Sequence, residues 1–107
     1  MSKMAIVGRK DVYLGFKALG LTVIDAHGAR EAEVAVLDLA KQGFSIIFVS
    51  EDLAQGIMSV VEKFNQQPAP AIVMIPDHRG SLGLARERVR RLVEKAVGID
   101  ILAKERG

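Results

Sequence analysis

Two histidines and one serine occupy positions in this sequence that would suit acid–base or nucleophilic chemistry. His27 and His78 each follow a short apolar run that is predicted to be a strand, and Ser50 ends a third such run. A general base or an activated serine needs a second side chain that holds it in place, and the nearby candidates are Asp25 and Asp77 alone. We therefore expect solvated loop histidines, a serine that caps a helix, and no catalytic residues.

The segment that begins at Arg79 is the best candidate for binding a small molecule. Gly80 and Gly83 flank a serine and a leucine, and such turns at the start of a helix present backbone N–H groups to phosphate. The same composition is common in ordinary turns. The nucleotide-binding motifs are absent after the first strand, where Gly8 is followed by Arg9. A small α/β protein that binds a phosphorylated metabolite at residues 80–83 remains an alternative.

The composition excludes several other classes of site. The chain has no Cys and two His, so a disulfide or a thiolate metal site is not available, and neither a metal nor a cofactor is expected. Aromatic residues make up 5% of the chain, which leaves no set of rings for stacking nucleobases. The apolar runs are far shorter than the roughly 18 residues of a membrane helix. We expect a cytoplasmic protein that binds no nucleic acid and inserts no segment into the membrane.

Four short runs rich in β-branched residues alternate with segments of helical periodicity. The runs are apolar almost without alternation, as in parallel strands covered on both faces, and comprise residues 4–7, 21–24, 45–49 and 71–75. Helices are expected at residues 11–19, 29–42, 53–64 and 85–96. Right-handed crossovers then predict a single three-layer α/β domain, with a four-stranded parallel sheet in the order 2-1-3-4 and four helices.

The chain is expected to divide into a core and a more mobile C-terminal part. Residues 1–76 form the α/β core, residues 77–102 a glycine loop and a helix, and residues 103–107 a polar tail. Two of the four residues predicted to pack this helix on the sheet, Ala85 and Ala96, are small, so the buried stripe is thin. We therefore expect the helix to be mobile or to contact a partner.

Positive charge is concentrated in this C-terminal part. The formal net charge is +2, but residues 1–76 carry seven Lys/Arg against eight Asp/Glu, and residues 77–107 carry eight against five. On a helix, the arginines fall on two flanks with Glu87 and Glu94 between them, which favours a protein-binding or solvated face over a nucleic-acid interface.

One flank of the C-terminal helix is the predicted partner-binding surface. A rotation of about 100° per residue aligns one apolar residue with three cations, namely Leu84, Arg88, Arg91 and Lys95. Arg79 precedes them in the glycine loop. This flank suits an acidic helix of another protein, because arginine is favoured at interfaces. Val34 and Met58 lie outside the buried stripes of their own helices and form the alternative partner-binding surface.

Four motifs, in this order along the chain, resemble the F subunit of the V/A-type rotary ATPases. They lie at residues 15–20, 51–54, 70–83 and 93–102, and the resemblance covers nearly the whole chain. Two positions depart from the pattern of that family. Arg9 stands where an acidic residue is expected, and Tyr13 stands where a small polar residue is common.

The resemblance implies a non-catalytic rotor subunit of the central stalk. Such a subunit binds the coiled coil of the D subunit, turns with it inside the catalytic A/B hexamer, and helps couple ATP hydrolysis or synthesis to ion transport. It would lie on the cytoplasmic side, peripheral to the membrane, in the soluble sector of the ATPase. A degenerate receiver-like adaptor is a further alternative, since Ser50 takes the place of the phosphoacceptor aspartate and Arg9 that of an acidic residue.

Overall fold

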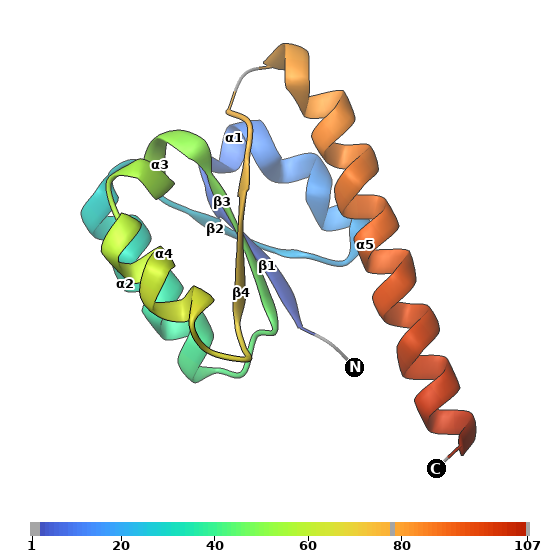
Figure 1. The fold of residues 1–107 in the computed structure, drawn as a ribbon. Coiled ribbons are helices and arrows are strands. Elements are labelled where there is room, and N and C mark those ends of the chain that lie inside the picture. The colour runs from blue at the N-terminus through green and yellow to red at the C-terminus, as the bar shows by residue number, and fades with distance from the viewer. Residues whose placement is uncertain (1–2, 78, 107) are drawn as a thin grey trace.

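A four-stranded parallel sheet forms the middle layer of the molecule (Figure 1). The computed structural model describes the backbone of residues 3–77 and 79–106, and the side chains of residues 3–77 and 82–98. The strands are β1 (Met4–Gly8), β2 (Thr22–Asp25), β3 (Ile46–Ser50) and β4 (Ala71–Ile75). They lie in the order β2-β1-β3-β4, and every pairing is parallel. The predicted sheet and its strand order are confirmed.

Helices cover both faces of the sheet (Figure 1). One face carries α2 (Ala29–Lys41), α3 (Glu51–Gln55) and α4 (Met58–Asn65). The other carries α1 (Lys10–Tyr13), the 3-10 helix η1 (Leu14–Leu19) and α5 (Arg79–Arg106). Successive side chains of a strand point to opposite faces, so the two central strands, β1 and β3, supply both cores. This arrangement confirms the predicted three-layer α/β architecture.

The helix that the sequence predicts over residues 53–64 is two helices, α3 and α4, which are separated at Gly56. A Cβ atom on Gly56 would lie 2.7 Å from the Cβ of Ala29, so glycine lets the end of α3 approach the start of α2. Ile57 then leaves the helical conformation, with φ −129° and ψ 32°. Together with the split of the first helix into α1 and η1, the described residues form five α-helices and one 3-10 helix instead of four helices.

Two glycines that follow helices have left-handed backbone conformations. Gly20, which ends η1, has a φ of 90°, and Gly43, just beyond α2, has a φ of 84°. A residue with a side chain is strained at such angles, which is why glycine ends these helices.

The C-terminal helix begins earlier and ends later than the sequence predicts. We expected residues 77–83 to form a loop, but α5 starts at Arg79 and continues for 28 residues to Arg106. The loop prediction was wrong because glycine disfavours a helix by only about 1 kcal/mol per residue, which neighbouring good helix formers offset. In Figure 1, the second half of α5 runs past the sheet and away from the other elements. The division of the chain into a core and a mobile C-terminal part stays a prediction.

Candidate functional site

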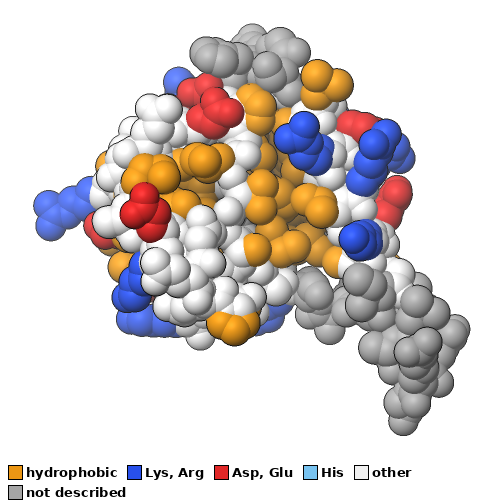
Figure 2. Space-filling model, viewed as in Figure 1, with side chains coloured by type: hydrophobic (Ala, Val, Ile, Leu, Met, Phe, Trp, Pro, Cys, Tyr) orange, Lys and Arg blue, Asp and Glu red, His pale blue; other side chains and the backbone are white. Residues whose placement is uncertain are grey.

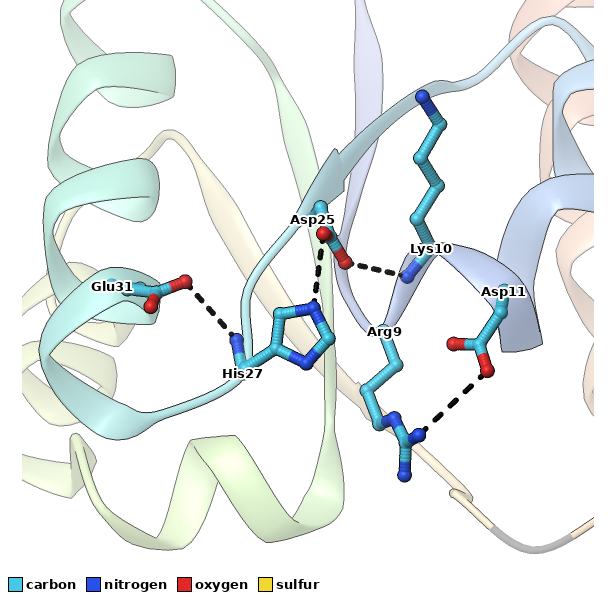
Figure 3. A network of polar contacts seen from close by, with 6 residues as sticks. All are labelled: Arg9, Lys10, Asp11, Asp25, His27 and Glu31. Carbon is cyan, nitrogen blue, oxygen red and sulfur yellow. Dashed lines mark hydrogen bonds and ion pairs between the residues drawn. The ribbon is translucent and has the colours of Figure 1, made fainter.

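An exposed polar network lies at the carboxyl ends of β1 and β2 (Figure 3). The ring atom Nε2 of His27 lies 3.0 Å from Oδ2 of Asp25, and the backbone N–H of Lys10 donates to Oδ1 of the same carboxylate at 2.8 Å. The backbone N–H of His27 donates to Glu31 at 3.3 Å. The bond from Lys10, followed by the bond from His27, lowers the pKa of Asp25. The network therefore joins the loop after β2 to the start of α1.

Asp25 holds the ring of His27, as a general base requires, but the pair is open to solvent. The side chains of His27 and Asp25 are both about half exposed, and the nearby pair of Arg9 and Asp11, 3.7 Å apart, is more exposed still. Exposed ion pairs contribute about 0–1 kcal/mol to stability and therefore hold a side chain only weakly. The prediction of a solvated loop histidine is confirmed for His27, while His78 lies outside the described residues.

Ser50 has a different role from the one that the sequence predicts. It stands at the N-cap of α3, but its side chain makes no capping hydrogen bond. The residue is 2% exposed, and it lies beside Tyr13, whose pKa is raised by burial and lowered in part by the Ser50 hydroxyl. The hydroxyl of Tyr13 donates to the carbonyl oxygen of Pro76 at 2.8 Å. Sequence analysis could not foresee this neighbour, because Tyr13 lies in another element and reaches Ser50 only in the folded sheet.

Tyr13 lies across the end of β1, where open α/β sheets usually bind their ligands. A Cβ atom on Gly8, the last residue of β1, would lie 2.6 Å from the tyrosine ring. The cavity that remains beside the ring measures about 100 Å³. Burial is the main reason that the pKa of Tyr13 is raised, and the carboxylates of Asp77 and Asp52 raise it further. The neutral phenol therefore acts as a buried structural donor that fills this end of the sheet.

The predicted phosphate-binding loop is absent from the structure, because residues 79–83 belong to α5. The side chains of Arg79 and the serine at position 81 lie outside the described residues. An added Cβ atom on Gly83 would meet no atom within 4 Å, so its backbone is not pressed against another part of the fold. In the described part of the chain, no group of three or more His, Cys, Asp or Glu side chains is placed to hold a metal ion.

A groove runs along the flank of α5 that the sequence singles out. It is lined by Leu84, Glu87, Arg88, Arg91, Leu92 and Lys95. The structure thus brings together all the predicted partner-binding residues whose side chains it describes; Arg79 lies outside them. Leu84 is 78% exposed and contributes a large apolar side chain to this groove.

Some cations on α5 form ion pairs with carboxylates of the same helix, and others do not. Arg90 bonds to Glu87, and this contact lowers the pKa of the glutamate. Arg91 shares the same carboxylate at 3.6 Å. Among the described side chains, no carboxylate lies within ion-pair distance of Arg88 or Lys95. These two cations on the groove are therefore available to an acidic partner.

An apolar surface adjoins this flank. Figure 2 shows hydrophobic side chains gathered over β4 and between β4 and α5. Val73, Leu92 and Val93 are only partly buried on the face that α5 covers, and Met74, which shares the opposite face of β4 with Ile72, is exposed. Sequence analysis missed Met74 because it treated all four strands as covered on both faces. The predicted strand order contained the signal, since it makes β4 an edge strand.

The alternative residues Val34 and Met58 lie apart from each other. Val34 lines a second groove, between β2 and α2, whereas Met58 begins α4 and is not among the residues that line this groove. The second groove lies on the face of the sheet opposite to α5 (Figure 1). No helix within the described residues has the length and apolar character needed to cross a lipid bilayer.

Comparison with known proteins identifies the family. The model of the ATP synthase (F/14-kDa) subunit matches residues 4–93. The chain belongs to this family. The F subunit of the V-type ATP synthase of Clostridium botulinum strain Eklund 17B is 43% identical over 100 residues, which cover 94% of the chain and 97% of the relative.

More distant relatives agree with this result. The F subunit of the V-type ATP synthase of Fusobacterium nucleatum is 38% identical, with 95% of the chain and 97% of the relative covered. The F subunit of the A-type ATP synthase of Methanothermobacter thermautotrophicus is 30% identical, with 94% and 97% covered. The resemblance stated from the sequence is confirmed. Because the family is an accessory subunit of ATP synthase, the chain is a non-catalytic subunit and not an enzyme by itself.

Proposed function

We propose that the chain is a central-stalk subunit of a V/A-type rotary ATPase, which braces the coiled coil of the D subunit and turns with it inside the A/B hexamer. In this role it helps couple ATP hydrolysis or synthesis to ion translocation, in the soluble sector on the cytoplasmic side. The names of its relatives support this assignment. The observation that carries it is the α5 flank, where exposed Leu84 lies in one groove with cations that lack partners within the described residues.

A brace of this kind needs a rigid body and an exposed gripping surface. The parallel sheet with its two cores supplies the rigid body, because packed interiors transmit strain with little deformation. The helix α5 supplies the surface, since 28 residues extend about 42 Å at 1.5 Å per residue. The exposed side of α5 can lie along another helix over several turns.

The chemistry of the flank specifies an acidic, partly apolar helix as its partner. Burial of Leu84 would contribute about 1.5–3 kcal/mol. Arg88 and Lys95 could each pair with a carboxylate of the partner without breaking an ion pair to a described side chain of this chain, which favours an intermolecular pair. The apolar surface over β4 and α5 lies beside this flank and extends the area that a coiled coil can cover.

The affinity for the D subunit tests this proposal. We expect Arg88→Glu combined with Arg91→Glu to weaken binding by at least about 2 kcal/mol, or roughly 30-fold, because both charges then repel an acidic helix. Calorimetric titration of the full chain with the purified D subunit measures the effect. Circular dichroism of each variant shows whether folding is unchanged.

Two further variants make the result specific. The change of Lys41→Glu with Lys63→Glu alters the net charge equally on α2 and α4, and should leave the affinity within about twofold. Val34→Glu tests the alternative surface. Equal binding by the wild type and the α5 double variant would overturn the α5 assignment, and a loss with Val34→Glu alone would place the interface on α2.

A further inference from the structure

The groove between β2 and α2 has features that the α5 surface does not explain. It is lined by Ile24, Asp25, Gly28, Arg30, Glu31, Val34, Ala35 and Asp38, and its volume is about 580 Å³. It lies at the other edge of the sheet from β4, since β2 pairs only with β1. Val34, one of these residues, is 55% exposed.

The helix α2 presents one exposed apolar side chain, that of Val34, to this groove. Its core-facing stripe consists of Ala32, Val36 and Leu39. Val34 lies outside that stripe, where a surface helix usually carries polar residues, whereas Ala35 borders the stripe and is partly buried against the core. The partly buried Ile24 of β2 extends the apolar floor toward the edge of the sheet.

Carboxylates flank this apolar floor at a regular spacing. Glu31 and Asp38 stand seven residues apart, which places them on the same side of α2, two turns or about 10 Å apart. Within the described residues, Asp38 forms no ion pair, and Glu31 accepts only from the backbone N–H of His27. Arg30 is the one cation among the residues that line the groove. The rim therefore carries net negative charge.

We propose that the β2–α2 groove is a second docking surface, which takes an amphipathic helix of another protein with two cations on one side of that helix, about two turns apart, and a small apolar residue between them. Lys or Arg residues seven positions apart on that helix match the spacing of Glu31 and Asp38, and a small apolar residue between them covers Val34. The net acidic rim repels the phosphates of nucleic acids and of anionic lipids, so the groove selects a basic protein segment.

The partner in this groove differs from the one on α5. The two surfaces carry opposite charge and lie over opposite faces of the sheet, so one acidic helix cannot suit both and two helices can bind at once (Figure 1). The chain would then bridge two proteins, which goes beyond the bracing of a single coiled coil. A second copy of this chain could offer the α5 flank to the groove, and such head-to-tail contacts would assemble the chain into rings or filaments.

Site-specific photocrosslinking in cells tests this proposal. The full chain carries the photoreactive residue p-benzoylphenylalanine at position 34, at position 84 as a reference for the α5 surface, or at position 62 of α4 as a negative control. The crosslinked segment is identified by mass spectrometry. We expect position 34 to crosslink to a helical segment of another protein with Lys or Arg seven residues apart, and position 62 to crosslink to nothing.

Charge reversal completes the test. Glu31→Lys with Asp38→Lys should lower the yield at position 34 at least fivefold, while Asp11→Lys with Glu62→Lys, which alters the net charge equally, should not. Arg88→Glu with Arg91→Glu should lower the yield only at position 84. Failure at position 84 alone counts against the stalk assignment and leaves the groove supported. No crosslink at position 34, a crosslink to an acidic segment, or a crosslink to a second copy of the chain overturns the proposal.

Discussion

Tyr13 connects three parts of the fold through one buried hydroxyl. Its side chain is 1% exposed, its hydroxyl donates to Pro76 just after β4, and its ring meets Phe16 edge-on with centroids 5.8 Å apart. The sequence indicated only that this position departs from the family pattern. The role of Tyr13 depends on tertiary contacts, because Ser50 and Pro76 are far from it in the chain. For the same reason the predicted capping role of Ser50 was wrong.

The Tyr13→Phe variant should be less stable by about 1–2 kcal/mol at pH 7, since the carbonyl of Pro76 loses its hydrogen-bond donor. Urea denaturation measures the change. The wild type should also lose stability as the pH rises above about 10. The raised pKa of Tyr13 means that the unfolded chain releases this proton first, which favours unfolding at high pH.

The Tyr13→Phe variant also serves as the control for the pH dependence of the wild type. Tyr13→Phe removes the ionising group, so its stability should fall less steeply than that of the wild type between pH 9 and about 11. Parallel curves for the two proteins, or an unchanged urea midpoint at pH 7, would show that the buried hydroxyl does not stabilise the fold.

Gly8→Ala tests the close approach of β1 to the same ring. The added Cβ atom would lie 2.6 Å from the ring of Tyr13, so either the ring or the strand must shift. We expect a loss of about 1–3 kcal/mol in unfolding free energy, as for other overpacked cores. Gly83→Ala is the matched control, because its Cβ meets nothing within 4 Å and alanine favours the helix. Similar unfolding free energies for the two variants would exclude a steric role for Gly8.

The strands were predictable at the level of elements because their signal is local. Buried parallel strands need unbroken β-branched runs, and the run at residues 71–75 coincides with β4. The helix boundaries were less predictable where contacts between residues far apart in the chain determine them. The break at Gly56 depends on Ala29, which precedes it by 27 residues, and no pattern within residues 53–64 reveals it.

The helix α5 should be the least protected of the long elements. Its first half packs on η1 through a thin stripe that includes Ala85 and Val89, and Leu92 and Val93 are only partly buried. We expect amides of residues 84–98 to exchange at least roughly tenfold faster than those of β1 and β3 in the free chain, because local opening exposes little apolar surface. Hydrogen exchange with mass spectrometry measures this difference.

Assembly provides the contrasting state for this prediction. If a coiled coil covers α5, the exchange of these amides should slow in the assembled protein while β1 and β3 change little. Equal protection of α5 and the central strands, in both the free and the assembled protein, would contradict both a mobile helix and a contact-making one.

The surface of the whole molecule has one basic region and one acidic region, although the net charge is only +2. The basic flank of α5 was visible in the sequence because all its members lie on one helix and follow helical spacing. Of the acidic groove, sequence analysis identified only Val34 as a candidate partner-binding residue. The floor of this groove also needs Ile24 of β2, and the sequence does not show how far a strand edge lies from a helix that covers the sheet.

Salt should therefore act on the α5 surface in a measurable way. Binding to the D subunit should weaken progressively between about 50 mM and about 500 mM NaCl, because ions screen the attraction between exposed cations and an acidic helix at separations near a Debye length of about 10 Å. The Arg88→Glu, Arg91→Glu variant lacks two of the cations and should show a slope near zero or of opposite sign. The Lys41→Glu, Lys63→Glu variant has the same net charge and should keep the slope of the wild type. If all three proteins show one slope, the salt dependence comes from the net charge of the molecule, and the flank of α5 is not where the partner binds.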